Sequence, residues 1–235
     1  LGDFKIPDNL LELKRVAVVL KATKMLKEKV GDKLPVMVGL EGPTTLAGHL
    51  VGVERLAIWF RRKPEEVKKA LEVAAEANII YVKALVDAGA DVIVVNDPTA
   101  SPDILSPKDF DATIKPYLAK VAEAIKAVKV LHICGRATPI LKSMAEAGYD
   151  VISIEEKVNM REAKQIVGDM ARVIGNISPA KTLLMGTPQQ VKEESIQAIK
   201  DGTDALAPGC GLAPRTPTAN LRAMVEAAIE AGYRG

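Results

Sequence analysis

Three segments of the chain repeat one pattern: a helical stretch stops at glycine, aspartate follows two residues later, and a short apolar run comes next. These segments are "DAGADVIVV" (87–95), "EAGYDVISI" (146–154) and "KDGTDALAP" (200–208). Glycine in this position is typical of a helix C-terminus, and apolar runs this short are typical of strands buried on both faces. The pattern therefore predicts an α/β fold built from consecutive βα units around a parallel sheet.

Hydrophobic periodicity extends this prediction to the rest of the chain. We expect strands over six apolar runs, at 35–40, 91–97, 129–134, 150–155, 172–177 and 204–209. We expect helices over 14–31, 64–91, 139–150 and 187–204. Six strands suffice for an open doubly wound sheet but are two fewer than a closed (β/α)8 barrel needs. No G-x-G-x-x-G motif follows the first strand, so a dinucleotide-binding fold has no local support.

Composition narrows the class of protein. The 235 residues are 48% hydrophobic, which suits one domain, 1–235, with a sizeable core. A net charge of +2 and only 3% aromatic residues argue against nucleic acid or an anionic membrane as partner. Two cysteines do not make a disulfide framework. Since we find no secretory signal and no membrane-spanning apolar run, we expect a cytoplasmic protein.

The printed sequence begins with leucine rather than methionine. We therefore expect it to be a processed or truncated version of a longer protein.

Polar side chains gather at the C-terminal ends of the six predicted strands. They are Glu41, Asp97, His132 with Cys134, Glu155 with Glu156, Asn176 with Ser178, and Cys210. In α/β folds, and above all in barrels, that rim carries the active site. Some of these residues are polar simply because strands end where polarity begins. Two cysteines and a histidine are explained less well in that way.

His132, Cys134 and Cys210 are the candidate metal ligands. His132 and Cys134 are two residues apart on one predicted strand, so their side chains share a face, while Cys210 follows another strand. One histidine and two cysteines leave a fourth position open, which is typical of catalytic zinc. The alternative is that all three are ordinary core residues.

The segment 41–52, "EGPTTLAGHLVG", contains the other histidine, His49. Its glycine and threonine content could hold a small anion or the edge of a substrate. Alternatively it is a plain βα loop in which Thr44 or Thr45 is the N-cap of a helix, and we favour that interpretation for Thr45.

Six segments in this order resemble the uroporphyrinogen decarboxylase superfamily, and more narrowly its methylcobalamin:coenzyme M methyltransferases. They are "GLEGPTTLAGHLVG", "DAGADVIVVNDPTASPDILSP", "VLHICG", "ISIEEK", "VIGNIS" and "DALAPGCGLAP". The resemblance implies a (β/α)8 TIM barrel, here with about six βα units visible. It also implies a missing N-terminal region that would supply the other two strands.

The same resemblance implies a chemistry. His132, Cys134 and Cys210 would hold Zn²⁺, and a methyl group would pass from a methylated corrinoid, carried on a corrinoid protein, to the thiol of coenzyme M. Glu155 would be a fourth ligand that the substrate displaces, or a hydrogen-bond partner of His132. Asp97 would orient a ligand or pin a neighbouring loop at the rim. Arg136 is our candidate for binding the sulfonate of coenzyme M, and His49 stays an open candidate for substrate contact.

Three other functions remain open from the sequence. The first is a decarboxylase of porphyrin precursors, which needs no metal. The second is a related zinc-dependent corrinoid methyltransferase with another donor or acceptor. The third is a truncated barrel that binds a corrinoid protein or a subunit without turnover.

Overall fold

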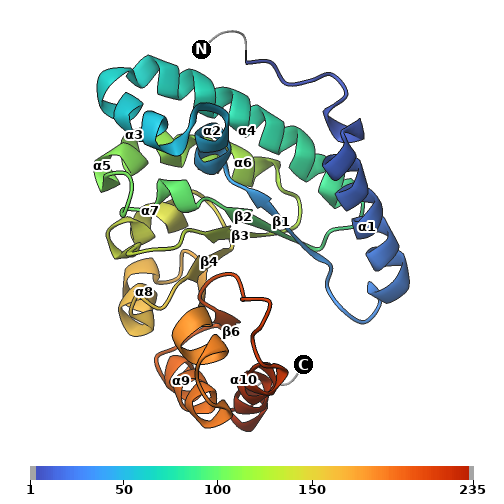
Figure 1. The fold of residues 1–235 in the computed structure, drawn as a ribbon, viewed down its shortest axis with the longest axis vertical. Coiled ribbons are helices and arrows are strands. Elements are labelled where there is room, and N and C mark those ends of the chain that lie inside the picture. Colours follow the sequence, from blue (N-terminus) through green and yellow to red (C-terminus); the bar gives the residue numbers. More distant parts are fainter. Residues whose placement is uncertain (1–3, 233–235) are drawn as a thin grey trace.

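Six parallel strands form one sheet in the computed structural model, which describes residues 4–232. The strands are β1 (Met37–Glu41), β2 (Val92–Asn96), β3 (Val128–His132), β4 (Val151–Ile154), β5 (Arg172–Ile177) and β6 (Ala205–Pro208). They lie side by side in chain order, each paired in parallel with the next (Figure 1). This arrangement confirms the predicted α/β class and corresponds to six consecutive units of a TIM barrel.

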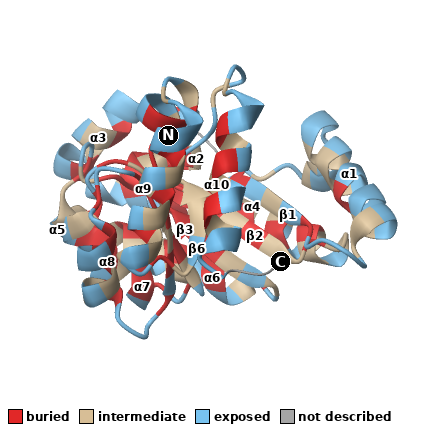
Figure 2. Ribbon diagram, turned by 90° about the horizontal axis from the view of Figure 1, so that it is seen from below, coloured by how far each residue is buried: buried red, intermediate tan, exposed pale blue. Residues whose placement is uncertain are grey.

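Helices form an outer arc around the strands (Figure 1). They are α1 (Lys14–Val30), α2 (Pro43–Val51), α3 (Val53–Arg62), α4 (Pro64–Asp87), α5 (Pro107–Asp109), α6 (Lys115–Ala124), α7 (Leu141–Glu146), α8 (Met160–Val167), α9 (Pro188–Lys200) and α10 (Thr218–Glu230). Helix α1 stands apart from the others, and Thr23 is its one buried residue (Figure 2). None of the described helices is long and apolar enough to cross a membrane.

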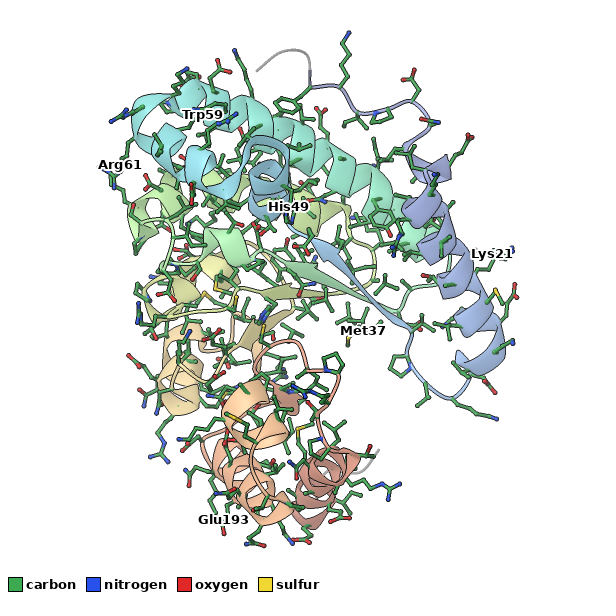
Figure 3. All side chains as sticks on the ribbon, in the orientation of Figure 1. Lys21, Met37, His49, Trp59, Arg61 and Glu193 are labelled. Carbon is green, nitrogen blue, oxygen red and sulfur yellow. The ribbon has the colours of Figure 1, made fainter. Side chains whose placement is uncertain are left out.

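The two faces of the sheet differ in burial. On β2, Ile93 and Val95 are fully buried under the helices, whereas Val94 and Asn96 on the opposite face stay partly exposed. Strands β1 and β6 each pair on one side only within the described residues, and Met37 of β1 is 60% exposed (Figure 3). The partial barrel is therefore open between β1 and β6, and its inner face is accessible from that side.

The aspartate of each repeated segment fixes the register of two neighbouring strands. Its carboxylate, at the start of one strand, accepts a hydrogen bond from a backbone N–H at the start of the preceding strand. The bonds run from Val36 to Asp91 (2.8 Å), from Lys129 to Asp150 (3.0 Å) and from Val173 to Asp204 (2.7 Å). The repeated aspartate therefore ties β1 to β2, β3 to β4 and β5 to β6 at their N-terminal ends.

The repeated glycine lets the chain turn from helix to strand. Gly89, Gly148 and Gly202 have φ angles of +102°, +86° and +96°. This left-handed region suits glycine and ends a helix, because other residues meet a steric clash there. The helix predicted over 64–91 accordingly ends at Asp87, and the helix predicted over 187–204 ends at Lys200.

Three boundaries predicted from the sequence are wrong. The strand predicted over 129–134 ends at His132, so Cys134 lies in the loop that follows. Helix α2 begins at Pro43 with Gly42 as its N-cap, so neither Thr44 nor Thr45 is the N-cap. The helix predicted over 139–150 is shorter at both ends, as α7.

Candidate metal centre

A row of four polar residues crosses the inner face of the sheet at its C-terminal end. Glu41 of β1 pairs with Asn96 of β2, Asn96 with His132 of β3, and His132 with Ser153 of β4. Residues paired in parallel strands point to the same side, so the four side chains form one layer. The layer beneath it is apolar, with Gly39 paired to Val94 and so on across the sheet.

His132, Cys134 and Cys210 come together at one end of this row. The ligand atoms of the three side chains all lie within 4.8 Å of one another. They line a cavity of about 280 Å³ that Glu41 and Asn96 also line. The three residues predicted as ligands from their strand-end positions are thus adjacent in space, although Cys134 and Cys210 lie on loops.

His132 presents one free nitrogen to this cluster. Its side chain is buried, with 8% of the residue exposed, and its Nδ1 lies 3.1 Å from Ser153 Oγ. Its Nε2 is buried and has no hydrogen-bond partner among the described residues. Burial lowers the pKa of His132, which favours the neutral ring that a metal requires. A buried, unpaired nitrogen beside two thiols fits a metal ion, which would supply the missing partner.

The two cysteines differ in their surroundings. Cys134 is half-buried, and burial, with the nearby Cys210 and Glu155, raises the pKa of its thiol to about 11. Cys210 is exposed in the loop after β6. Forming a thiolate at Cys134 is unfavourable in this setting unless a cation compensates the charge, and a bound divalent metal does that. The donor set therefore fits a thiophilic divalent ion.

Glu155 holds the loop that carries Cys134. One carboxylate oxygen accepts a hydrogen bond from the backbone N–H of Gly135 at 2.7 Å, and the other pairs with Lys157 at 2.8 Å. Glu155 lies beyond the end of β4 and reaches this loop, while Nδ1 of His132 is paired with Ser153. Of the two roles expected for Glu155, the hydrogen bond to His132 is therefore not formed here, and the role of a fourth ligand that the substrate displaces stays a prediction.

Asp97 lies at the rim, as predicted, but its carboxylate is fully buried. The oxygens accept hydrogen bonds from the backbone N–H groups of Thr44 and Thr45, at 3.2 and 2.6 Å, at the start of α2. Its own N–H donates to the carbonyl of His132 at 2.9 Å. Burial raises the pKa of Asp97 to about 6, while these hydrogen bonds oppose the shift. Asp97 therefore ties the first turn of α2 to the end of β3, and the expected role in orienting a ligand stays a prediction.

The two remaining predicted residues lie outside the cavity wall. Arg136 is exposed, and its Nε pairs with Asp103 at 3.0 Å. His49 is exposed in the last turn of α2 (Figure 3). Neither is among the residues that line the cavity beside His132.

Ser153 and Asn96 are the contacts that the sequence reasoning missed. Both interrupt apolar strands, Ser153 in "VISI" and Asn96 at the end of "VIVVN". Their polarity within apolar runs was the available signal. The repeated aspartates alone do not place them in one row, because Asn96 lies five residues after Asp91 whereas Ser153 lies three after Asp150.

The chain matches the family model described as "Uroporphyrinogen decarboxylase (URO-D)" over residues 1–231. It is 45% identical to the methylcobamide:CoM methyltransferase MtaA of Methanosarcina barkeri, over 96% of this chain and 67% of the relative. It is 38% identical to the methylcobamide:CoM methyltransferase MtbA of Methanosarcina acetivorans, over 93% of this chain and 65% of the relative.

Among solved structures, a methyltransferase from Methanosarcina mazei superposes with a TM-score of 0.93 at 45% identity, covering 96% of this chain and 67% of that one. The chain thus spans about two thirds of the length of these relatives. The family model, the sequence identity and the superposed backbone all point to the same family. The chain belongs to the uroporphyrinogen decarboxylase family, and within it the chain is similar to methylcobamide:CoM methyltransferases.

Proposed function

We propose that this chain forms the catalytic part of a zinc-dependent methyltransferase that moves a methyl group from a methylated corrinoid to the thiol of coenzyme M. The observation that carries the proposal is the cluster of His132, Cys134 and Cys210 within a cavity. Its support from outside the chain is the 45% identity to a methylcobamide:CoM methyltransferase. A metal-free decarboxylase would leave this cluster without a purpose.

His132 through Nε2 and the two cysteines through Sγ would hold the zinc. Bound there, Zn²⁺ would lower the pKa of the coenzyme M thiol, which is about 8.5 for a free thiol, and keep it as a nucleophilic thiolate. The two cysteine thiolates balance the double positive charge, and the neutral imidazole adds none. In the overall reaction a carbon–sulfur bond forms and the cobalt–carbon bond breaks. The bonding electron pair stays on cobalt as Co(I), and the thiol proton is released.

The protein keeps the cluster at a cavity rather than in a closed core. The cavity of about 280 Å³ is lined by all four residues of the polar row and by the exposed Cys210. No Lys or Arg is among the described residues that line it. The proposal therefore expects the sulfonate of coenzyme M to be bound by a cation outside this wall, and a corrinoid protein to approach at the same rim.

The proposal is tested by methyl transfer with purified, zinc-loaded protein. Methylcobalamin and coenzyme M should yield methyl-coenzyme M and the absorption spectrum of Co(I), and Cys210→Ala should yield neither. Other thiols and a reduced pterin serve as alternative acceptors, and methylated corrinoid proteins of different substrate pathways as alternative donors. Transfer to another acceptor in place of coenzyme M would revise the substrate. Equal turnover by wild type and Cys210→Ala would refute the proposed site.

A further inference from the structure

Ser153 contacts the ring of His132 across the sheet. The two residues are paired in register on adjacent strands, β3 and β4, and Ser153 Oγ lies 3.1 Å from His132 Nδ1. Both side chains line the cavity that contains Cys134 and Cys210. Ser153 is therefore within the layer of the candidate centre, although the sequence analysis assigned it no role.

The hydrogen bond matters because a neutral imidazole carries one proton on either of its two nitrogens. When the proton is on Nδ1, a hydroxyl can accept a hydrogen bond from Nδ1–H. The lone pair available to a metal is then on Nε2. Nε2 is the atom that lies buried without a partner in the described residues, on a ring that offers a ligand nitrogen within 4.8 Å of both thiols. Because the serine hydroxyl occupies Nδ1, Nε2 is the nitrogen left for a metal.

We propose that Ser153 is a positioning residue for the metal centre: its Oγ accepts a hydrogen bond from His132 Nδ1–H and so presents Nε2 to the metal held by Cys134 and Cys210. The inference rests on the proposed function, since it assumes that the cluster binds metal. Outer partners of this kind fix both the tautomer and the orientation of a histidine ligand. Losing one costs about 10–100-fold in metal affinity in well-characterised sites.

Two substitutions of nearly equal volume separate the hydroxyl from its bulk. Ser153→Thr keeps a hydroxyl, and Ser153→Val replaces it with a methyl group; both β-branched side chains suit a strand. Zinc affinity is measured by competition with a chromophoric chelator, and the coordination sphere by the visible spectrum of the Co²⁺-loaded protein. Thermal unfolding of the metal-free variants shows that they remain folded.

We expect Ser153→Thr to bind zinc like the wild type and Ser153→Val to bind it about 10–100-fold more weakly, with a changed Co²⁺ spectrum. Equal affinity and equal spectra for the two variants, both folded, would overturn the inference. A wild-type protein that binds no zinc at all would instead overturn the proposed function. The two failures are therefore distinguishable, and neither depends on measuring methyl transfer.

Discussion

The two halves of the candidate metal centre are built differently. The β3 half, His132 and Cys134, is anchored on several sides: by Ser153 at His132 Nδ1, by Glu155 at Gly135 N–H and by Asp97 at the carbonyl of His132. In the β6 half, Cys210 and Gly211 are exposed on the loop after β6, and Gly209 before them is buried. The backbone of this half is tied to the sheet through the Gly209 N–H, which donates to Ile177 at 2.8 Å.

This difference suggests separate tasks for the two halves: one holds ligands in fixed positions, and the other leaves the site open to solvent. The β3 half would fix the position of two of the proposed ligands through hydrogen bonds that belong to the fold. The β6 half would add the third from a solvent-exposed position in the cavity wall, on the side from which the proposed thiol substrate would enter. We therefore expect changes in the two halves to affect metal binding alike but stability unequally.

The largest expected effect is the loss of metal from either half. Cys134→Ala and Cys210→Ala each remove one of three ligands, so zinc affinity should fall by more than about 100-fold and methyl transfer should nearly vanish. On the metal-free proteins, Cys210→Ala should change the free energy of unfolding by less than about 0.5 kcal/mol, because that side chain is exposed. Cys134→Ala should cost about 1 kcal/mol. Chelator competition measures the zinc affinity, and urea unfolding measures the free energy of unfolding. Retention of bound zinc by either variant would contradict the ligand assignment.

The glycine after each cysteine offers a matched pair of variants. Gly135 has φ +87°, and a Cβ there would lie 2.6 Å from Asp103 Oδ2 and against Ser101 Oγ. A Cβ at Gly211 would meet nothing within 4 Å. Gly135→Ala should therefore lower the free energy of unfolding by about 1–3 kcal/mol, whereas Gly211→Ala should stay within about 0.5 kcal/mol.

Urea unfolding of both glycine variants without metal measures this contrast. Equal losses of stability would show that the loop after β6 is as constrained as the loop after β3, and the comparison between the halves would fail.

A smaller effect concerns Asp97, which supports the β3 half. Because burial raises its pKa from 3.8 to about 6, the folded protein holds the proton more tightly than the unfolded chain does. Stability should then fall as pH rises from about 4 to about 6, by up to about 3 kcal/mol from this group. Asp97→Asn should remove that part of the slope. Urea unfolding at pH 4.5, 5.5 and 6.5 compares the two proteins, and parallel pH profiles would contradict the assigned cause.

The sheet could be predicted well from the sequence because the repeated glycine and aspartate each have a specific structural role. Gly89 and its counterparts end helices at positive φ, and Asp91 and its counterparts bond the neighbouring strand. Strand positions and the gathering of polar residues at one rim follow from these local rules. The proximity of His132, Cys134 and Cys210 follows from the rim in turn.

Contacts between loops could not be predicted in the same way. Glu155 follows a strand as Asp97 does, yet it bonds the Gly135 N–H and Lys157, while Asp97 bonds the first turn of α2. Which backbone group a strand-end carboxylate meets depends on the path of the adjacent loop, which periodicity does not specify. The pairing of Arg136 with Asp103, 33 residues away, is decided by the same loop paths.

Metal analysis of the purified chain tests the central claim most directly. We expect about one zinc per chain in the wild type after removal of loosely bound metal, as for a single three-ligand site. Cys134→Ala and Cys210→Ala, treated identically, should retain almost none. A folded wild-type protein that holds no zinc, or variants that hold as much as the wild type, would contradict a metal centre formed by His132, Cys134 and Cys210.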